Sequence, residues 1–178
     1  MIQPDLGSLP QIIVIAGAPG TGKSSLAKLL QEHSGSPLFE FGWIPEYRNR
    51  PNGQIPYEEE EQISFENLVL VCKNYLKHGY RGIILTDLAE KRIAEIEHAF
   101  KGDDYRIVTL VMDDETVLKQ RVLDPQRSSG YRDWQEALAI NQAVKGRRLF
   151  PKEVRLNLTG KDQEQVYLEL ISILESCA

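Results

Sequence analysis

Gly17-Ala18-Pro19-Gly20-Thr21-Gly22-Lys23-Ser24 is the stretch that decides the fold, because it fits the pattern G-x-x-x-x-G-K-[ST]. The apolar run 12–16 before it predicts a buried parallel strand, and the run 25–30 after it predicts a helix. Glycines let successive backbone amides point inward at phosphate oxygens, and the helix N-terminus adds its positive end. The alternative is a glycine-rich turn that contains Lys-Ser by coincidence, which would need no such strand and helix beside it. The stretch therefore predicts a phosphate cradle.

Each part of this phosphate loop has an expected role. Lys23 is expected to reach the β- and γ-phosphates, and the hydroxyl of Ser24 is expected to ligate Mg²⁺. The loop residues that we expect to bind the nucleotide are Gly17, Ala18, Pro19, Gly20, Thr21, Gly22, Lys23, Ser24 and Ser25.

The whole chain has the composition of a soluble globular protein. Its 178 residues are enough for one domain with a substantial core and too few for two ordinary domains. A net charge of −5 argues against a general nucleic-acid surface or an acidic-membrane surface, so the expected partner is a small molecule. Cys72 and Cys177 have no metal-ligand spacing and suggest no disulfide framework. No apolar run is long enough to span a bilayer, so we expect a cytoplasmic protein.

Strand and helix patterns alternate along the chain. Apolar or alternating runs predict strands at 12–16, 37–41, 82–87, 105–112 and 154–158. Helical patterns follow each of them, at about 25–33, 58–78, 90–100, 113–123, 133–148 and 162–176. Asp113 can cap the fourth of these helices, while Asp133 with Glu136 and Asp162 with Gln165 form capping-box patterns. The alternation predicts a three-layer α/β domain with a parallel sheet and the phosphate loop at its carboxyl edge.

Two connections contain residues of the kinds that bind substrates or take part in catalysis. Residues 42–57 contain several turn formers together with Trp43, Tyr47, Arg48 and Arg50, which would suit a flat or sugar-like acceptor, including one with an anionic group. A loop packed by its own aromatic side chains would look the same.

Residues 124–132 form the second connection and follow a helix that carries Arg121. Arg121, Arg127 and Arg132 are spaced as in a lid that closes over a γ-phosphate, with Arg127 the favoured catalytic residue. The alternative is that they are surface cations near a helix end.

One carboxylate is a candidate for the metal shell or for orienting an acceptor. Asp87 ends a buried strand, where a magnesium ligand or a general base is needed, although it could instead cap the next helix.

The surroundings of the phosphate loop narrow the class of protein. Thr159-Gly160-Lys161-Asp162 has the wrong spacing for a guanine-recognition motif, and the chain has no room for the helical lid domain of AAA+ ATPases. The order of elements resembles the small P-loop kinases of the nucleoside monophosphate kinase superfamily, especially the shikimate kinase, gluconate kinase and chloramphenicol phosphotransferase-like branch. The resemblance rests on Gly17 to Ser24, the long helix after the second strand and the Arg121-x5-Arg127 spacing.

This resemblance implies a five-stranded parallel sheet in the order 2-3-1-4-5, with Arg121 and residues 159–162 flanking the adenine. It also implies one kinase-like domain over 1–178, with a small lid at about 122–134 and an acceptor-binding region at about 40–78. The expected activity is an ATP- and Mg²⁺-dependent phosphotransferase, in which Ser24 and Asp87 hold the metal. Kinases of this kind commonly have an aspartate at the end of the second strand, as a base or a ligand of the acceptor. This chain departs from that pattern: the nearest carboxylate is Glu40, its competitor is Glu46, and the alternative is that Glu40 is an outward residue between two core phenylalanines. Lys23, Asp87, Arg127 and Glu40 are the expected catalytic residues. The alternative is a nucleotide-binding regulatory switch or an NTPase without a small-molecule acceptor.

Overall fold

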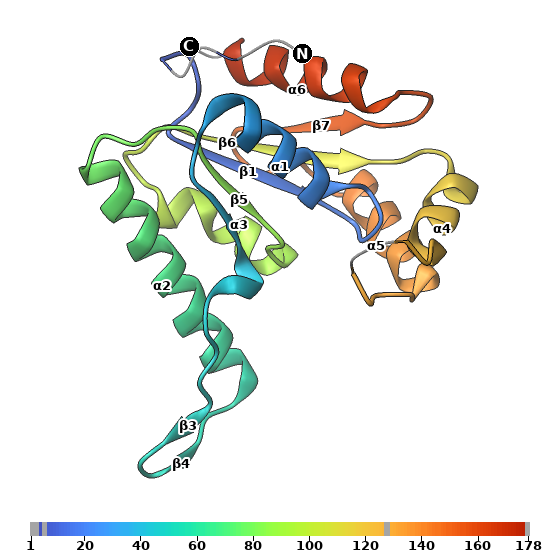
Figure 1. Ribbon diagram of the computed structural model, residues 1–178. Helices are drawn as coiled ribbons and strands as arrows, with labels where there is room; N and C mark the ends of the chain where they lie inside the picture. The colour runs from blue at the N-terminus through green and yellow to red at the C-terminus, as the bar shows by residue number, and fades with distance from the viewer. Residues whose placement is uncertain (1–3, 5–6, 127–128, 177–178) are drawn as a thin grey trace.

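The structure is a computed structural model that describes residues 4, 7–126 and 129–176. Its centre is a five-stranded parallel sheet in the order β2-β5-β1-β6-β7 (Figure 1). The bounds are β1 Ile12–Gly17, β2 Leu38–Glu40, β5 Ile83–Thr86, β6 Tyr105–Val111 and β7 Glu153–Asn157. Among these main strands the order is the predicted 2-3-1-4-5. The chain therefore starts at the central strand β1, passes to the edge strand β2 and returns to β5 between them. It then continues through β6 to the other edge strand, β7.

Helices cover both faces of the sheet (Figure 1), which is why buried apolar side chains predominate in its central strands. Their bounds are α1 Lys23–Ser34, α2 Tyr57–Lys77, α3 Glu90–Ala99, α4 Glu115–Leu123, α5 Trp134–Gly146 and α6 Gln163–Glu175. In β1, Ile13 and Ile15 pack with the core of α1, α4, α5 and α6. Ile12 and Val14 point the other way, into the core under α2 and α3. This alternation along one buried strand gives the three layers predicted from the sequence.

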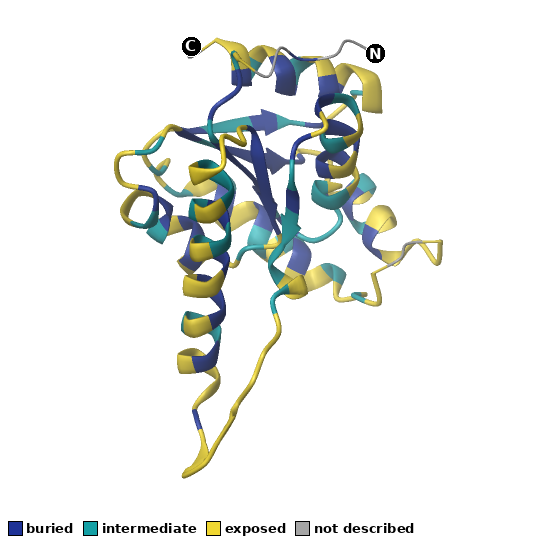
Figure 2. Cartoon of the chain, turned by 60° about the vertical axis from the view of Figure 1, so that its left-hand side comes forward, coloured by how far each residue is buried: buried dark blue, intermediate teal, exposed yellow. Residues whose placement is uncertain are grey.

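A slender projection between β2 and α2 was not predicted. After β2 the chain makes a short 3-10 turn, η1 Phe41–Trp43, and then the two-stranded hairpin of β3 Asn49–Arg50 and β4 Gly53–Gln54. The hairpin and the first turns of α2 extend away from the body of the domain (Figures 1 and 2). We call residues 44–61 the arm. Most of its residues are exposed, because little of the chain packs against it.

The helix ends correct two details of the sequence analysis. Asp114, rather than Asp113, caps α4, because its side chain accepts a hydrogen bond from the amide of Val117. At α5, Asp133 accepts from the amide of Glu136, but the Glu136 side chain accepts from the hydroxyl of Tyr131 instead of completing the box. The capping box at the start of α6 is confirmed. In the described part of the chain, no helix is both long and apolar enough to cross a membrane.

Candidate functional site

The phosphate loop connects β1 to α1 in a conformation that only glycine adopts without strain. Gly17, Gly20 and Gly22 have φ values of 133°, 89° and 90°. A Cβ on Gly17 would lie 2.5 Å from the carbonyl oxygen of Leu110, and one on Gly20 would lie 2.6 Å from Cγ2 of Val122. These two glycines are therefore required both by backbone conformation and by the close approach of β6 and α4.

Hydrogen bonds hold the loop in place without a ligand. The Thr21 hydroxyl donates to the carbonyl oxygen of Ala18 over 2.8 Å, and Nζ of Lys23 donates to the same oxygen over 3.1 Å. Gly22 is the N-cap of α1, and the first turn of this helix contains no acidic side chain. The positive end of the helix and the Lys23 ammonium therefore face the region where an anion would bind.

This loop forms the floor of a cleft of about 900 Å³ at the carboxyl edge of the sheet. Side chains from both halves of the sheet line it. Its lining includes Pro19 to Leu26, Lys28, Glu40, Asp87, Leu110, Arg121, Asp124, Gln126, Ser129, Tyr131, Leu158, Lys161, Asp162, Gln163 and Val166. The cleft thus has the size of a small-molecule site, with the glycine-rich loop at its floor.

Two of the predicted carboxylates meet in this cleft. Glu40 ends β2 and is half-buried, while Asp87 follows β5, the neighbouring strand, and is exposed. Asp87 does not cap α3, since the N-cap residue is Ala89. It has a φ of 65°, a left-handed conformation that Asp tolerates better than most residues. Glu46 lies in the arm and does not line the cleft.

Phe39 and Phe41, on either side of Glu40, pack against the core under α2 and α3. Core phenylalanines therefore do alternate with Glu40, as expected if Glu40 is an outward residue without a catalytic role. The same alternation directs Glu40 to the cleft, so the two interpretations of this residue are compatible.

The groups in the cleft are compatible with a magnesium-bound nucleotide. Ser24 and Asp87 offer a hydroxyl and a carboxylate, and Mg²⁺ in such sites takes one or two protein oxygens and completes its shell with phosphates and water. Among the described residues, no group of three or more His, Cys, Asp or Glu side chains could hold a metal.

Of the three arginines expected in a lid, one lines the cleft, one does not, and one lies outside the described residues. Arg121, at the last turn of α4, lines the cleft. Arg132 does not, and it donates to the backbone carbonyls of Ser129 and Tyr131. Arg127 lies outside the described residues. Tyr131 and Gln126 also line this side of the cleft and were missed, because neither belongs to a motif.

The aromatic and basic residues expected to bind an acceptor are not brought to the cleft. Trp43 is 55% exposed and Tyr47 is 77% exposed, so this loop is not packed by its own aromatics either. The guanidinium groups of Arg48 and Arg50 are paired with Glu60 and Glu59 in the arm. None of the four residues lines the cleft described above.

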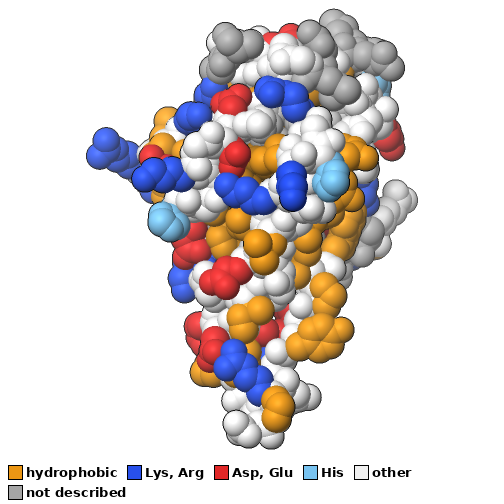
Figure 3. Space-filling model, turned by 90° about the vertical axis from the view of Figure 1, so that its left-hand side faces the viewer, with side chains coloured by type: hydrophobic (Ala, Val, Ile, Leu, Met, Phe, Trp, Pro, Cys, Tyr) orange, Lys and Arg blue, Asp and Glu red, His pale blue; other side chains and the backbone are white. Residues whose placement is uncertain are grey.

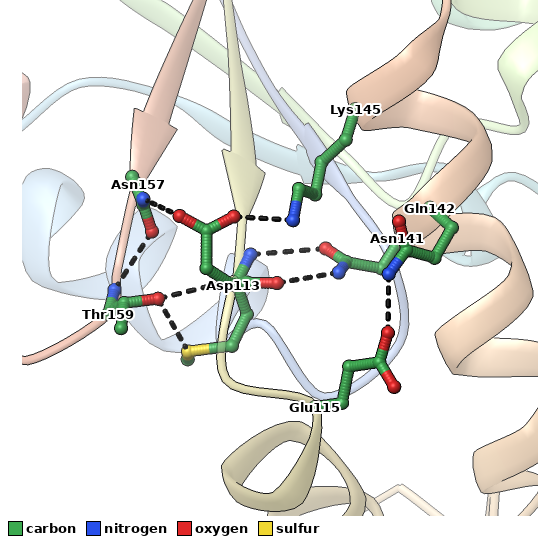
Figure 4. A network of polar contacts seen from close by, with 8 residues as sticks. Asp113, Glu115, Asn141, Gln142, Lys145, Asn157 and Thr159 are labelled. Atoms are coloured by element: carbon green, nitrogen blue, oxygen red, sulfur yellow. Dashed lines mark hydrogen bonds and ion pairs between the residues drawn. The ribbon is translucent and has the colours of Figure 1, made fainter.

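A polar network joins the loops that follow β6 and β7 (Figure 4). The carboxylate of Asp113 pairs with Lys145 of α5 and accepts from the amide of Asn157, while its backbone amide donates to the Thr159 hydroxyl over 2.8 Å. Asn141 donates to and accepts from the backbone of Met112 over 2.7 and 3.1 Å. The network thereby holds α5 and both loops together.

Lys145 and Asn157 keep the pKa of the Asp113 carboxyl below its ordinary value, because both stabilise its charged form. The loop after β7 leads directly into Lys161, Asp162 and Gln163, which line the cleft. Of these, Lys161 and Asp162 fall in the segment that the resemblance placed beside the adenine. Gln163 and Lys28 were missed; for Lys28 the helical spacing of four residues from Ser24 was the available signal.

No family model matches the chain, and no curated protein sequence is significantly similar to it. Solved structures are similar in fold at low sequence identity. A gluconokinase from Sinorhizobium meliloti 1021 superposes with a TM-score of 0.65 and 17% identity, covering 96% of this chain and 94% of that chain. Thymidylate kinase from Candida albicans gives 0.61 and 18%, covering 94% and 92%.

A shikimate kinase from Bacteroides thetaiotaomicron gives a TM-score of 0.58 and 16% identity, covering 92% of this chain and 98% of that chain. These similarities extend over nearly the full length of each chain, so they describe the whole arrangement of sheet and helices. The structural neighbours of the chain are therefore small P-loop kinases, and the chain has a P-loop kinase-like α/β fold.

Proposed function

We propose that the protein is an ATP- and Mg²⁺-dependent phosphotransferase that moves the γ-phosphoryl group to a hydroxyl or phosphate of a small molecule. The observation that carries the proposal is the composition of one cleft. A phosphate loop forms its floor, and two carboxylates from the neighbouring strands β2 and β5 reach the same cavity. A simple nucleotide-binding module needs the loop and a magnesium ligand such as Asp87, but it has no need for the second carboxylate, Glu40, beside it.

The protein groups in the cleft divide the work of phosphoryl transfer. Backbone amides of residues 17–25 bind the phosphates, and Lys23 neutralises the β- and γ-phosphate oxygens. Ser24 and Asp87 would hold Mg²⁺, which would supply positive charge to the phosphates when it is bound. Arg121 would lie beside the nucleoside, and Arg127 would add positive charge as the lid region, residues 122–134, closes.

Asp87 or Glu40 would orient the acceptor for attack. In the transfer to a hydroxyl, a bond forms between the acceptor oxygen and the γ-phosphorus, and the bond from this phosphorus to the β,γ-bridging oxygen breaks. ADP leaves with that electron pair, and the hydroxyl proton passes to the carboxylate and then to solvent.

A screen for ADP formation tests the proposal. Purified protein, ATP and Mg²⁺ would be incubated with sets of small alcohols, sugars and monophosphates, and phosphorylated products would be identified by mass spectrometry. We expect an acceptor-dependent product that Lys23→Ala abolishes and Lys101→Ala preserves, since Lys101 is exposed and lies outside the cleft. Arg127→Ala should lower kcat far more than it weakens ATP binding, because its charge acts in the transition state.

Tight ATP binding with no acceptor-dependent product would contradict the kinase proposal. It would favour the second class of function, a nucleotide-binding switch or an NTPase without a small-molecule acceptor. Normal kcat in Lys23→Ala would contradict every role proposed for the phosphate loop.

A further inference from the structure

The two sides of the cleft differ in charge. Lys23 and Lys28 from α1, Arg121 from α4 and Lys161 from the loop before α6 all line it, together with two carboxylates, Asp124 and Asp162. The β2–β5 end contributes Glu40 and Asp87, and among the described residues no lysine or arginine lines that end. Basic side chains therefore outnumber carboxylates where the nucleotide is proposed to bind, whereas the charged side chains of the proposed acceptor end are carboxylates alone.

The arm begins at this negative end. η1 follows Glu40 directly, and a Cβ on Gly42 would lie only 3.8 Å from Oδ2 of Asp87. The arm contains five carboxylates and two guanidinium groups. Basic and acidic side chains meet along it in the space-filling view (Figure 3). Two guanidinium groups and five carboxylates give the arm a formal charge of −3, which has the same sign as the β2–β5 end.

Both arginines of the arm already have carboxylate partners. Nη2 of Arg50 lies 2.6 Å from Oε1 of Glu59, and Nε of Arg48 lies 3.8 Å from Oε2 of Glu60. The Glu60 side chain is only 2% exposed, and neither of its oxygens accepts a hydrogen bond in the described part of the chain. A carboxylate so deeply buried needs a compensating cation. Moving Arg48 to an anionic acceptor would leave Glu60 without the cation that the structure gives it.

The environment of Tyr57 supports the same picture. Its pKa is raised, first by desolvation and then by Glu46, Glu61, Glu60 and Glu58. Carboxylates from both ends of the arm therefore act on one point of it. Lys91, in the first turn of α3 after β5, is exposed and does not line the cleft.

From these charges we infer that the acceptor is a hydroxyl compound without an acidic group, and that amine-bearing members of this class are preferred. The inference rests on the proposed function and narrows it, since it removes phosphates and carboxylic acids from the acceptor classes. An ammonium group would be attracted by Glu40 and by the carboxylates of the arm, whereas a phosphate or carboxylate would be repelled by them and would find both arm arginines paired with glutamates.

Acceptors that share a carbon skeleton and carry a neutral, an amino or a carboxylate group test this inference. One set is glucose, glucosamine and glucuronate, and another is glycerol, 3-amino-1,2-propanediol and glycerate. Product formation would be followed by mass spectrometry with the wild type and with Lys23→Ala as the blank. We expect kcat/KM to fall from the amine to the acid within a set by on the order of tenfold or more, and this ratio to shrink at high salt.

A charge variant in the arm sharpens the test. Glu59→Gln removes the carboxylate partner of Arg50 at an exposed ion pair, so the fold should be unaffected. Because Arg50 could then attract an anion, this variant should raise kcat/KM for the acid relative to the amine. Glu97→Gln removes the same charge from an exposed position on α3 and should leave that ratio unchanged. Equal ratios in the two variants would remove the arm from the explanation and overturn the inference.

The outcomes separate this inference from the proposal on which it rests. A wild-type preference for the acidic members, with Lys23-dependent product, would overturn the acceptor charge but leave the kinase proposal standing. The absence of Lys23-dependent product with every member, while ATP still binds, would overturn both.

Discussion

Adding a single methyl group at Gly20 should displace α4 from the phosphate loop. Gly20 has a φ of 89°, and a Cβ there would lie 2.6 Å from Cγ2 of Val122 and 3.1 Å from Cδ1 of Leu118. Gly22 provides a matched control, because its φ is 90° and a Cβ there would meet nothing within 4 Å. Gly22→Ala therefore measures the backbone cost alone, whereas Gly20→Ala adds the clash.

The magnitudes follow from these two geometries. A left-handed backbone costs a residue with a Cβ about 1–2 kcal/mol, which applies to both variants. Overpacking against a buried side chain costs about 1–3 kcal/mol more, which applies only to Gly20→Ala. For a chain of 178 residues, each 1 kcal/mol lowers Tm by roughly 2–4 °C. Gly20→Ala should therefore melt at least about 2 °C, and up to about 12 °C, below Gly22→Ala.

Urea unfolding and thermal melting of both variants would measure this difference. In a Val122→Ala background the shorter clash, with Cγ2 of Val122, is absent and only the 3.1 Å approach to Cδ1 of Leu118 remains, so the extra cost of Gly20→Ala over Gly22→Ala should shrink. Because α4 also carries Arg121, Gly20→Ala should weaken ATP binding as well. Equal destabilisation by Gly20→Ala and Gly22→Ala, with no coupling to Val122, would refute the close approach of α4 to the loop.

Three further predictions concern ionisable groups. Burial raises the pKa of Glu153, but its hydrogen bonds with Arg147, with the Thr109 hydroxyl and with the Phe150 amide, together with the charge of Arg147, outweigh burial and lower this pKa. The stabilisation is therefore present at neutral pH and lost as pH falls below about 4, so Glu153→Gln should cost about 3 kcal/mol at pH 7 and less in acid by urea unfolding. Burial raises the pKa of the Cys72 thiol to about 12. In the variant Cys177→Ser, in which Cys72 is the one remaining cysteine, iodoacetamide at pH 8 should therefore label the protein only after denaturation. Asp113→Asn loses the ion pair with Lys145 and should raise KM for ATP about two- to fivefold, with a smaller decrease in kcat. A decrease in kcat as large as the increase in KM would contradict the interpretation that Asp113 only positions the loops beside the cleft.

The phosphate loop shows how much of the site could be predicted locally. The β-branched run of β1, the spacing of the glycines and the start of α1 are neighbours in sequence, so their structure follows from short-range preferences. Asp87 was placed at the cleft for a similar reason, since a buried strand of a parallel sheet ends at the carboxyl edge. The five main strands were identified because each is an apolar or alternating run between turn signals.

Other features depend on partners far away in the sequence. Asp113 and Asp114 are adjacent carboxylates, and either could have capped α4. Asp114 does so because Lys145 and Asn157 engage Asp113, and neither is close to it in sequence. Likewise, nothing in the order of residues shows that Arg48 lies against Glu60, twelve positions further on. Such pairings depend on the folded structure, because it brings residues that are distant in sequence within reach of each other.

By itself, the sequence of this protein determined the α/β architecture and the conformation of the glycine-rich loop between β1 and α1, because hydrophobic periodicity and glycine conformation act over a few residues. Only the tertiary structure decided that Glu40 and Asp87 share one cleft, since β2 and β5 are separated by α2 and become neighbours only through the sheet. It also decided that the arginines of the arm are occupied by glutamates. Electrostatic interactions depend on distance in space, and that distance is set by the fold.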